Sequence, residues 1–180
     1  MTTFLDDWRK FYGELPPLSF ALRNDERWVR FHSLPASKRY AQSPSEEVTV
    51  LHRANTVASD VIGADISWLA QSVPLEPKLA PGAARSRQIH GLMPAGSFVD
   101  DEVSWTIFAT ITHFRPGAFD NLIRDIAEER AFRTIWLSTR NGIVFAPYDG
   151  GIDVFMETAE AADTLKVKHR YWLSARADGL

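Results

Sequence analysis

Two carboxylates stand four residues apart around a glycine turn in the segment YDGGID, residues 148–153. Hard cations such as Mg²⁺ and Ca²⁺ take oxygen ligands from flexible loops, so Asp149 and Asp153 could contribute to a metal site. Two carboxylates are too few to hold such an ion, however, and their spacing differs from that of an EF-hand loop. Asp is also a common turn residue because its side chain accepts hydrogen bonds from nearby backbone N–H groups. We therefore interpret both residues as turn-forming and expect no metal.

Basic side chains gather in and just after a predicted strand near the N-terminus. They are Arg30, His32, Lys38 and Arg39, and the hydroxyl groups of Ser33, Ser37 and Tyr40 lie among them. Arginine binds phosphate and carboxylate through paired hydrogen bonds, so this group could hold an anionic ligand. The alternative, which the sequence favours, is an edge strand whose charges prevent aggregation.

A second basic group lies in a central segment rich in proline and glycine. No acidic residue separates the cations between residues 78 and 90, which include Arg85 and Arg87. Such a loop could cover an anionic ligand or engage an acidic partner, and the alternative is an exposed loop without a ligand. The candidate binding residues are therefore Arg30, His32, Lys38, Arg39, Arg85, Arg87, Tyr148, Asp149 and Asp153.

The usual arrangements for catalysis are absent from the sequence. His32 and Ser33 are adjacent, and successive strand residues point to opposite faces, so they cannot act together as base and nucleophile. There is no Gly-x-Ser-x-Gly elbow, Walker A motif or Gly-x-Gly-x-x-Gly motif, and no histidine has a second histidine three or four positions later. The absence of cysteine excludes thiolate nucleophiles and thiolate metal sites. We expect no catalytic residues and no cofactor.

Composition and charge are those of a globular chain. It has 180 residues, 45% of them hydrophobic and 12% aromatic, which fits one domain spanning residues 1–180. The net charge of −3 is spread evenly, so no segment has the basic excess of a nucleic-acid-binding protein. No window approaches about 18 consecutive apolar residues, and we expect no membrane-spanning helix. Asp6 and Asp7 stand where a secretory signal has its apolar core, so we expect a cytoplasmic protein.

Hydrophobic periodicity and turn residues predict the elements that must position these side chains. Helices are predicted at about 4–15, 44–62, 119–129 and 158–175, and strands at 27–34, 66–71, 103–113, 134–140, 143–148 and 152–155. Ser43-Pro44-Ser45-Glu46 carries the signals of a helix start, and the helix that follows is expected to bury Val48, Leu51, Asn55 or Ala58, and Ile62.

Asn141-Gly142 between two apolar runs predicts a tight hairpin. The segment 103–113 alternates cleanly between apolar and polar residues, and we expect it to share one antiparallel sheet with that hairpin. Residues 74–97, interrupted by prolines and glycines, are predicted to form a long irregular loop. The fold class that results is α+β, a single domain with a mainly antiparallel sheet of about six strands and about four helices packed chiefly on one face.

Several segments resemble a bacterial family of uncharacterised proteins. They are RFHSLPASKRY near the N-terminus, and FRPGAFDNLIRDIAEE, NGIVFAPYDGGIDVF and KHRYWLSARADGL in the C-terminal third. Members of that family carry a Pro-Tyr-Asp-Gly-Gly-x-Asp turn and a Trp-Leu-Ser…Gly-Leu tail. The resemblance implies a bacterial, intracellular source, and it transfers no functional residue.

The leading hypothesis from the sequence is a non-enzymatic binding module of the immunity or adaptor type. Its expected partner is another protein, with no role for nucleic acid or a membrane. Aromatic and arginine side chains suit such interfaces. The alternative is a small hydrolase or phosphate-handling enzyme that uses the basic N-terminal strand and the Asp149/Asp153 turn. A convergent pocket with acid and base groups would favour the enzyme, and a flat apolar and aromatic surface would favour the binding module.

Overall fold

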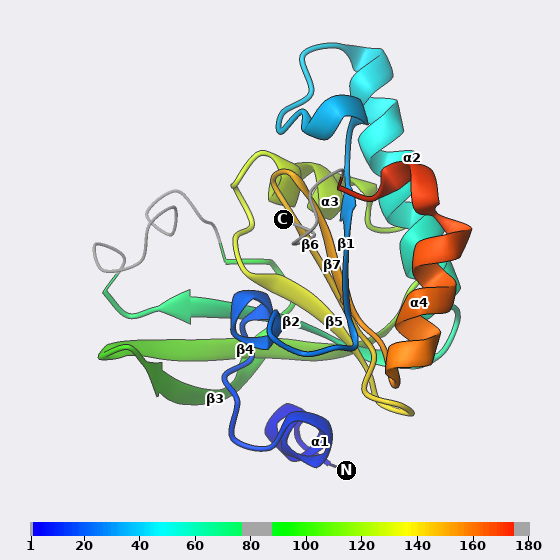
Figure 1. Ribbon diagram of the computed structural model, residues 1–180. Coiled ribbons are helices and arrows are strands. Elements are labelled where there is room, and N and C mark those ends of the chain that lie inside the picture. The colour runs from blue at the N-terminus through cyan, green and yellow to red at the C-terminus, as the bar shows by residue number, and fades with distance from the viewer. Residues whose placement is uncertain (1, 77–87, 175–180) are drawn as a thin grey trace.

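A seven-stranded antiparallel sheet forms the centre of the computed structural model, which describes residues 2–76 and 88–174 (Figure 1). The strands are β1 (Trp28–His32), β2 (Ile66–Pro74), β3 (Met93–Asp100), β4 (Val103–His113), β5 (Thr134–Ser138), β6 (Val144–Tyr148) and β7 (Gly151–Phe155). The α-helices are α1 (Phe4–Tyr12), α2 (Pro44–Val61), α3 (Asp120–Ala127) and α4 (Ala159–Lys168), and the short 3₁₀ helices are η1 (Ser19–Leu22), η2 (Pro35–Ser37) and η5 (Arg170–Trp172).

The order of the strands across the sheet is β1-β7-β6-β5-β2-β4-β3, and every pairing is antiparallel. A hairpin that contains Asn141-Gly142 joins β5 to β6, and β4 lies in the same sheet, as predicted. The turn is less tight than predicted, because the Ser138 backbone N–H donates to the Ile143 carbonyl at 2.8 Å and the loop spans residues 139–142. The α+β class is therefore confirmed, with one strand more than the sequence indicated. Strands β1 and β3 form the two edges of the sheet.

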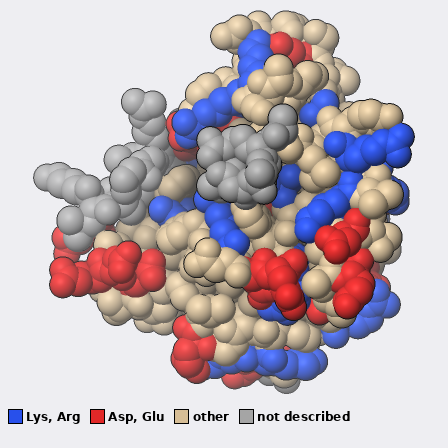
Figure 2. Space-filling model, viewed as in Figure 1, with Lys and Arg blue, Asp and Glu red and all other residues tan. Residues whose placement is uncertain are grey.

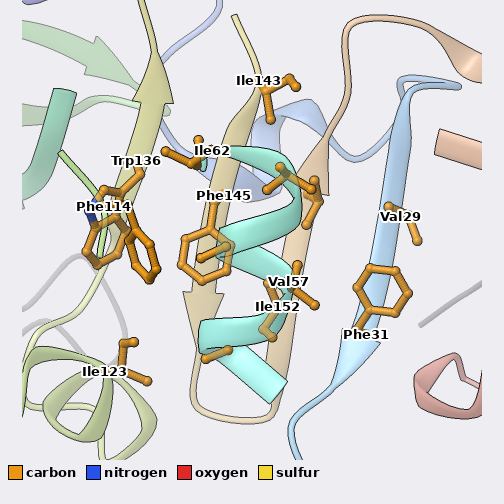
Figure 3. Close-up of a cluster of buried hydrophobic side chains, with 14 of the residues drawn as sticks. Val29, Phe31, Val57, Ile62, Phe114, Ile123, Trp136, Ile143, Phe145 and Ile152 are labelled. Atoms are coloured by element: carbon orange, nitrogen blue, oxygen red, sulfur yellow. The ribbon is translucent and has the colours of Figure 1, made fainter. Parts of the chain in front are cut away.

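Helices cover the two faces of the sheet unequally. In Figure 1, α2, α3 and α4 lie on one face and α1 lies on the other, which agrees with helices packed chiefly on one face. The larger core lies under α2 and α3, where Figure 3 shows the rings of Phe114, Trp136 and Phe145 close to one another. The rings of Trp136 and Phe145 have centroids 5.5 Å apart. This apolar layer holds α2 firmly against the strands and so places its buried residues.

The N-cap and the first turn of α2 are formed as the sequence predicts. Ser43 is the N-cap, its hydroxyl accepts a hydrogen bond from the Glu46 backbone N–H at 3.4 Å, and Pro44 occupies the first helical turn. The predicted buried face is only partly correct, because Val48 is 66% exposed. The helix buries Val50, Arg53, Ala54, Val57, Ala58 and Val61. The buried stripe thus includes a charged residue.

The predicted irregular loop at 74–97 is shorter than expected at both ends. Strand β2 extends to Pro74, strand β3 begins at Met93, and residues 77–87 lie outside the described residues. Pro94 and Gly96 obscured this strand in the sequence. A proline and a glycine are tolerated here because β3 is an edge strand with a register shift between these two residues.

The C-terminal helix is also shorter than predicted. It ends at Lys168 instead of continuing to residue 175, because His169 leaves the helical conformation and its Nε2 lies 2.7 Å from Asp60 Oδ2. The chain then turns through η5, and Leu173 forms a bridge to Phe31 of β1. The residues after α4 therefore lie beside β1.

None of the helices in residues 2–76 and 88–174 combines the length and apolarity that crossing a bilayer requires.

Gly142 in the hairpin is expected to accept no side chain without a large loss of stability. Gly142 has a φ of +74°, its carbonyl accepts a hydrogen bond from the Tyr12 hydroxyl at 2.6 Å, and an added Cβ would overlap the ring of Phe11. Gly142→Ala should lower the free energy of unfolding by about 2–4 kcal/mol, through backbone strain and the lost contact with α1. Gly117, with φ +82° and nothing within 4 Å, is the matched control. Gly117→Ala should cost about 1 kcal/mol in urea denaturation, and equal losses for the two variants would contradict the packing argument.

Candidate functional site

Asp153 is the centre of a buried ion group on the β1–β7 side of the sheet. Its carboxylate is fully buried and lies 2.8 Å from Arg23 Nη2 and 2.9 Å from Arg30 Nε. The indole N–H of Trp28 donates to it at 2.9 Å. The prediction that Asp153 forms the turn is therefore wrong, because it lies within β7, directly opposite Arg30 in β1. A buried carboxylate requires opposite charge and hydrogen-bond donors, and two arginines supply both.

The ring of Tyr148 packs against the two arginines of this ion group. The guanidinium carbons of Arg30 and Arg23 lie 5.0 Å and 5.8 Å from the centre of its ring. Burial raises the pKa of Tyr148 to about 12, and the negative charge of Asp153 acts in the same direction. The hydroxyl is therefore protonated at neutral pH. The sequence named Arg30, Tyr148 and Asp153 as candidates, and the structure brings all three together with Arg23 and Trp28.

A second charged group forms at the β6–β7 turn. Asp149 lies in this turn, as predicted, and pairs with Arg39. The Tyr40 hydroxyl lies 3.4 Å from the same carboxylate. Lys38 is turned away and pairs with Glu46 at 2.7 Å. The candidates of the basic strand and of the acidic turn are thus divided between two separate groups.

A small cavity of about 90 Å³ adjoins the Arg39–Asp149 pair, between α2 and α3. Its cations have acidic neighbours, since Arg39 pairs with Asp149 and Arg124 Nε lies 3.9 Å from Glu47 Oε2. The charges that line this cavity are therefore matched without a ligand. Figure 2 shows Lys and Arg around the middle of the face and also at its edges, with Asp and Glu groups below the middle and at the left edge, so charges of both signs are mixed on this face.

The end of β1 borders a larger cavity of about 180 Å³, which we call the Arg53 cavity. It is lined by His32, Leu34, Pro35, Ala36, Ser37, Arg53, Tyr171, Trp172 and Leu173. These residues come from β1, η2, α2 and the segment after α4, so the cavity exists only because that segment folds back beside β1. Arg85 and Arg87, the remaining candidates, lie outside the described residues.

Arg53 lies at the wall of this cavity and has no carboxylate partner among the described residues. The residue is 8% exposed, its Nη1 donates to the backbone carbonyl of His32 at 2.8 Å, and its guanidinium carbon lies 5.3 Å from the ring centre of Trp172. In the described part of the chain no carboxylate lies within 4.0 Å of the guanidinium, and neither Asp nor Glu lines the cavity. Burial lowers the pKa of Arg53, but a guanidinium remains charged at neutral pH.

His32 is kept neutral beside this cation. Burial lowers its pKa, and the positive charges of Arg30 and Arg53 lower it further. Its Nε2 lies 3.2 Å from Ser37 Oγ. The sequence excluded Ser33 as a partner of His32, and Ser33 is indeed buried, but the η2 turn brings Ser37 to the imidazole instead. The cavity thus combines a cation, a neutral imidazole and a hydroxyl.

Sequence reasoning missed Arg53, although a signal was present. Arg53 follows Val50 by three residues and precedes Val57 by four, which places it on the buried face that these two valines define. A cation on an apolar helical stripe requires a counter-charge or a function. Ser37 was noted as a hydroxyl group, but its pairing with His32 depends on the conformation of η2, which the sequence did not predict.

The chain matches the model of a family described as a domain of unknown function (DUF3885) over residues 19–177. No curated protein and no solved structure matches it. The matched range contains every residue of the Asp153 ion group and of the Arg53 cavity.

The Asp153 ion group should be a major contributor to stability. Asp153→Asn keeps the shape of the side chain but leaves the buried Arg30 and the half-buried Arg23 without their negative charge, so we expect a loss of about 3–5 kcal/mol in the free energy of unfolding. Asp163→Asn, which removes an exposed carboxylate paired with Lys166, is the control and should cost less than about 1 kcal/mol. Chemical denaturation measures both, and a loss for Asp153→Asn no larger than the control would contradict this role.

The imidazole of His32 should titrate below the usual histidine range. We expect its pKa, followed by NMR of the ring protons, to lie below about 6.5. Arg53→Gln should raise this pKa because it removes a nearby positive charge that disfavours the imidazolium. Arg124→Gln, which removes a cation from α3, should leave the pKa of His32 unchanged. A pKa above about 6.5 in the natural chain would show that the burial and charges of the cavity do not act as described.

Proposed function

The chain belongs to the DUF3885 family, and from that premise we propose that it is a binding module for a ligand with a small anionic group, phosphate or carboxylate. The observation that carries this proposal is the buried guanidinium of Arg53, which faces a cavity without a carboxylate partner among the described residues. Tyr171 and Trp172 at the same cavity offer aromatic surface to the remainder of the ligand.

The physical argument is one of charge. Removing a cation from water costs several kcal/mol unless an opposite charge accompanies it. Among the described residues, Arg53 is matched by one carbonyl acceptor and one aromatic ring, which compensate part of that cost. An anion in the cavity would supply the missing charge, and the planar guanidinium can offer paired N–H donors to the oxygens of phosphate or carboxylate.

Comparison with other arginines of the described chain favours the Arg53 cavity. Asp153 forms ion pairs with both Arg23 and Arg30, and Asp149 forms an ion pair with Arg39. Arg133 is also half-buried without a described carboxylate partner, but its guanidinium lies 4.4–4.8 Å from three aromatic ring centres. The rings of Phe20, Trp105 and Phe132 already surround it. Arg53 differs because it has no counter-charge within residues 2–76 and 88–174 and adjoins a cavity.

The two hypotheses from the sequence are affected differently. Asp149 and Asp153 belong to separate groups and are each paired with arginine, which removes the support for an enzyme that uses them together. The convergent Arg53 cavity favours a small ligand. A protein partner is a second candidate, supported by the edge strand β3, which exposes Met93 and Val99 and offers an edge for strand addition.

Anion binding should stabilise the folded protein through Arg53. With inorganic phosphate or acetate at about 100 times its dissociation constant, the natural chain should gain about 2.7 kcal/mol, a rise of about 5–10 °C in Tm. Arg53→Met should abolish that rise because it removes the cation but keeps an apolar side chain of similar length. Thermal unfolding at constant ionic strength, with sodium chloride as the reference salt, measures the effect.

The matched control is Arg124→Met, which removes an arginine from α3 away from the Arg53 cavity and should retain the full rise. Comparison of phosphate with acetate then identifies which anionic group the cavity prefers. Equal stabilisation of the natural chain and Arg53→Met would contradict the proposal. So would the absence of any anion-specific rise in the natural chain.

A further inference from the structure

Ser37 and His32 form a hydroxyl–imidazole pair at the mouth of the Arg53 cavity. The 3.2 Å between Ser37 Oγ and His32 Nε2 is close to the distance over which a serine hydroxyl can pass its proton to a neutral imidazole. Both residues line the same cavity as Arg53. Ser37 is exposed, so a ligand in the cavity has access to its oxygen.

The backbone that carries Ser37 is held in an unfavourable conformation. Ala36 and Ser37 have φ values of 54° and 55°, in the left-handed region that costs a residue with a side chain about 1–2 kcal/mol. The turn is closed by a hydrogen bond from the Lys38 backbone N–H to the Pro35 carbonyl at 3.2 Å, and by the Lys38–Glu46 ion pair. Such residues persist where the surroundings impose them, and they concentrate at functional sites. Here the conformation brings the Ser37 hydroxyl to His32.

The surroundings of His32 suit a general base. Burial, and then the neighbouring Arg30 and Arg53, disfavour its protonated form, so the imidazole is neutral at pH 7 and can accept a proton. No carboxylate of the described chain hydrogen-bonds the imidazole. The described residues therefore form a pair and not a triad, and we expect acylation to be slower than in enzymes whose histidine is held by a carboxylate.

We propose that Ser37 is a nucleophile, with His32 as its general base, toward carboxylic esters whose acid portion carries a second, anionic group that Arg53 holds. This inference rests on the proposed function, because Arg53 must bind the anionic group for that class of ester to be selected.

The reaction balances without an added cofactor. Ser37 Oγ attacks the ester carbonyl carbon while its proton moves to His32 Nε2, and a tetrahedral oxyanion forms. When this intermediate collapses, the bond to the alcohol oxygen breaks and His32 returns the proton to that oxygen, leaving an acyl group on Ser37. Water then attacks the acyl carbon, its proton passes through His32 to Ser37 Oγ, and the free acid is released. The net change is ester and water to acid and alcohol.

The test uses the full chain and two activated esters. The mono-p-nitrophenyl ester of glutaric acid carries the anionic group, and p-nitrophenyl acetate does not. We expect a burst of nitrophenolate and an acyl adduct on Ser37, located by mass spectrometry, with faster acylation by the glutarate ester.

Ser37→Ala should abolish the adduct, and His32→Gln should slow the acylation of Ser37 by about 100-fold or more. The controls are Ser45→Ala, at an exposed serine of α2, and His113→Gln, at an exposed histidine of β4; both should behave as the natural chain.

Arg53→Met separates this inference from the proposed function. It should abolish the preference for the glutarate ester while acetylation of Ser37 continues. If phosphate or acetate stabilises the protein through Arg53 but Ser37 gains no adduct, the nucleophile is disproved and anion binding stands. An adduct on another residue, or one that persists in Ser37→Ala, also overturns the inference. Equal acylation of Ser37 by both esters, unaffected by Arg53→Met, would overturn the substrate class and count against anion binding by Arg53.

Discussion

The pairing of Asp153 with Arg23 and Arg30 is the interaction on which the arrangement of the site depends. It joins β7 to the edge strand β1 and to the segment after η1, and it does so in a buried environment where charges are strong only when they are matched. Because β1 is held at this edge, His32 and the η2 turn follow at one defined position. The chain after α4 packs beside the same strand through Leu173 and Phe31.

The two buried charge groups beside β1 differ in one respect that separates structure from function. Around Asp153 the donors and acceptors satisfy one another, so the group serves to hold β1 against β7. Around Arg53 the charge is incomplete within the described chain, and the adjoining space is a cavity and not a packed core. Natural proteins retain such locally unfavourable arrangements chiefly where a ligand or a reaction completes them. The strained turn at Ala36 and Ser37, on the rim of the same cavity, is a second such arrangement.

Much of the fold could be predicted because its signals are local. The hairpin at Asn141-Gly142, the Ser43 cap of α2 and the alternation of β4 each depend on a few neighbouring residues, and all three are present, although the hairpin loop spans residues 139–142 instead of two residues. Strand β3 was missed because an edge strand tolerates the proline and the glycine that argue against a central one. The early end of α4 was missed because it depends on His169 meeting Asp60, which lies 109 residues away in the sequence.

The sequence by itself determined the α+β class, the antiparallel sheet, the turns and the absence of thiol chemistry, all of which follow from periodicity, turn residues and composition. Only the tertiary structure decided the roles of the charged residues. It placed Asp153 in a strand between two arginines, left Arg39 with Asp149, and brought Ser37 and Arg53 to His32. The physical reason is that the energy of a charge depends on its burial and on partners from distant segments, neither of which is encoded in the spacing of neighbouring residues.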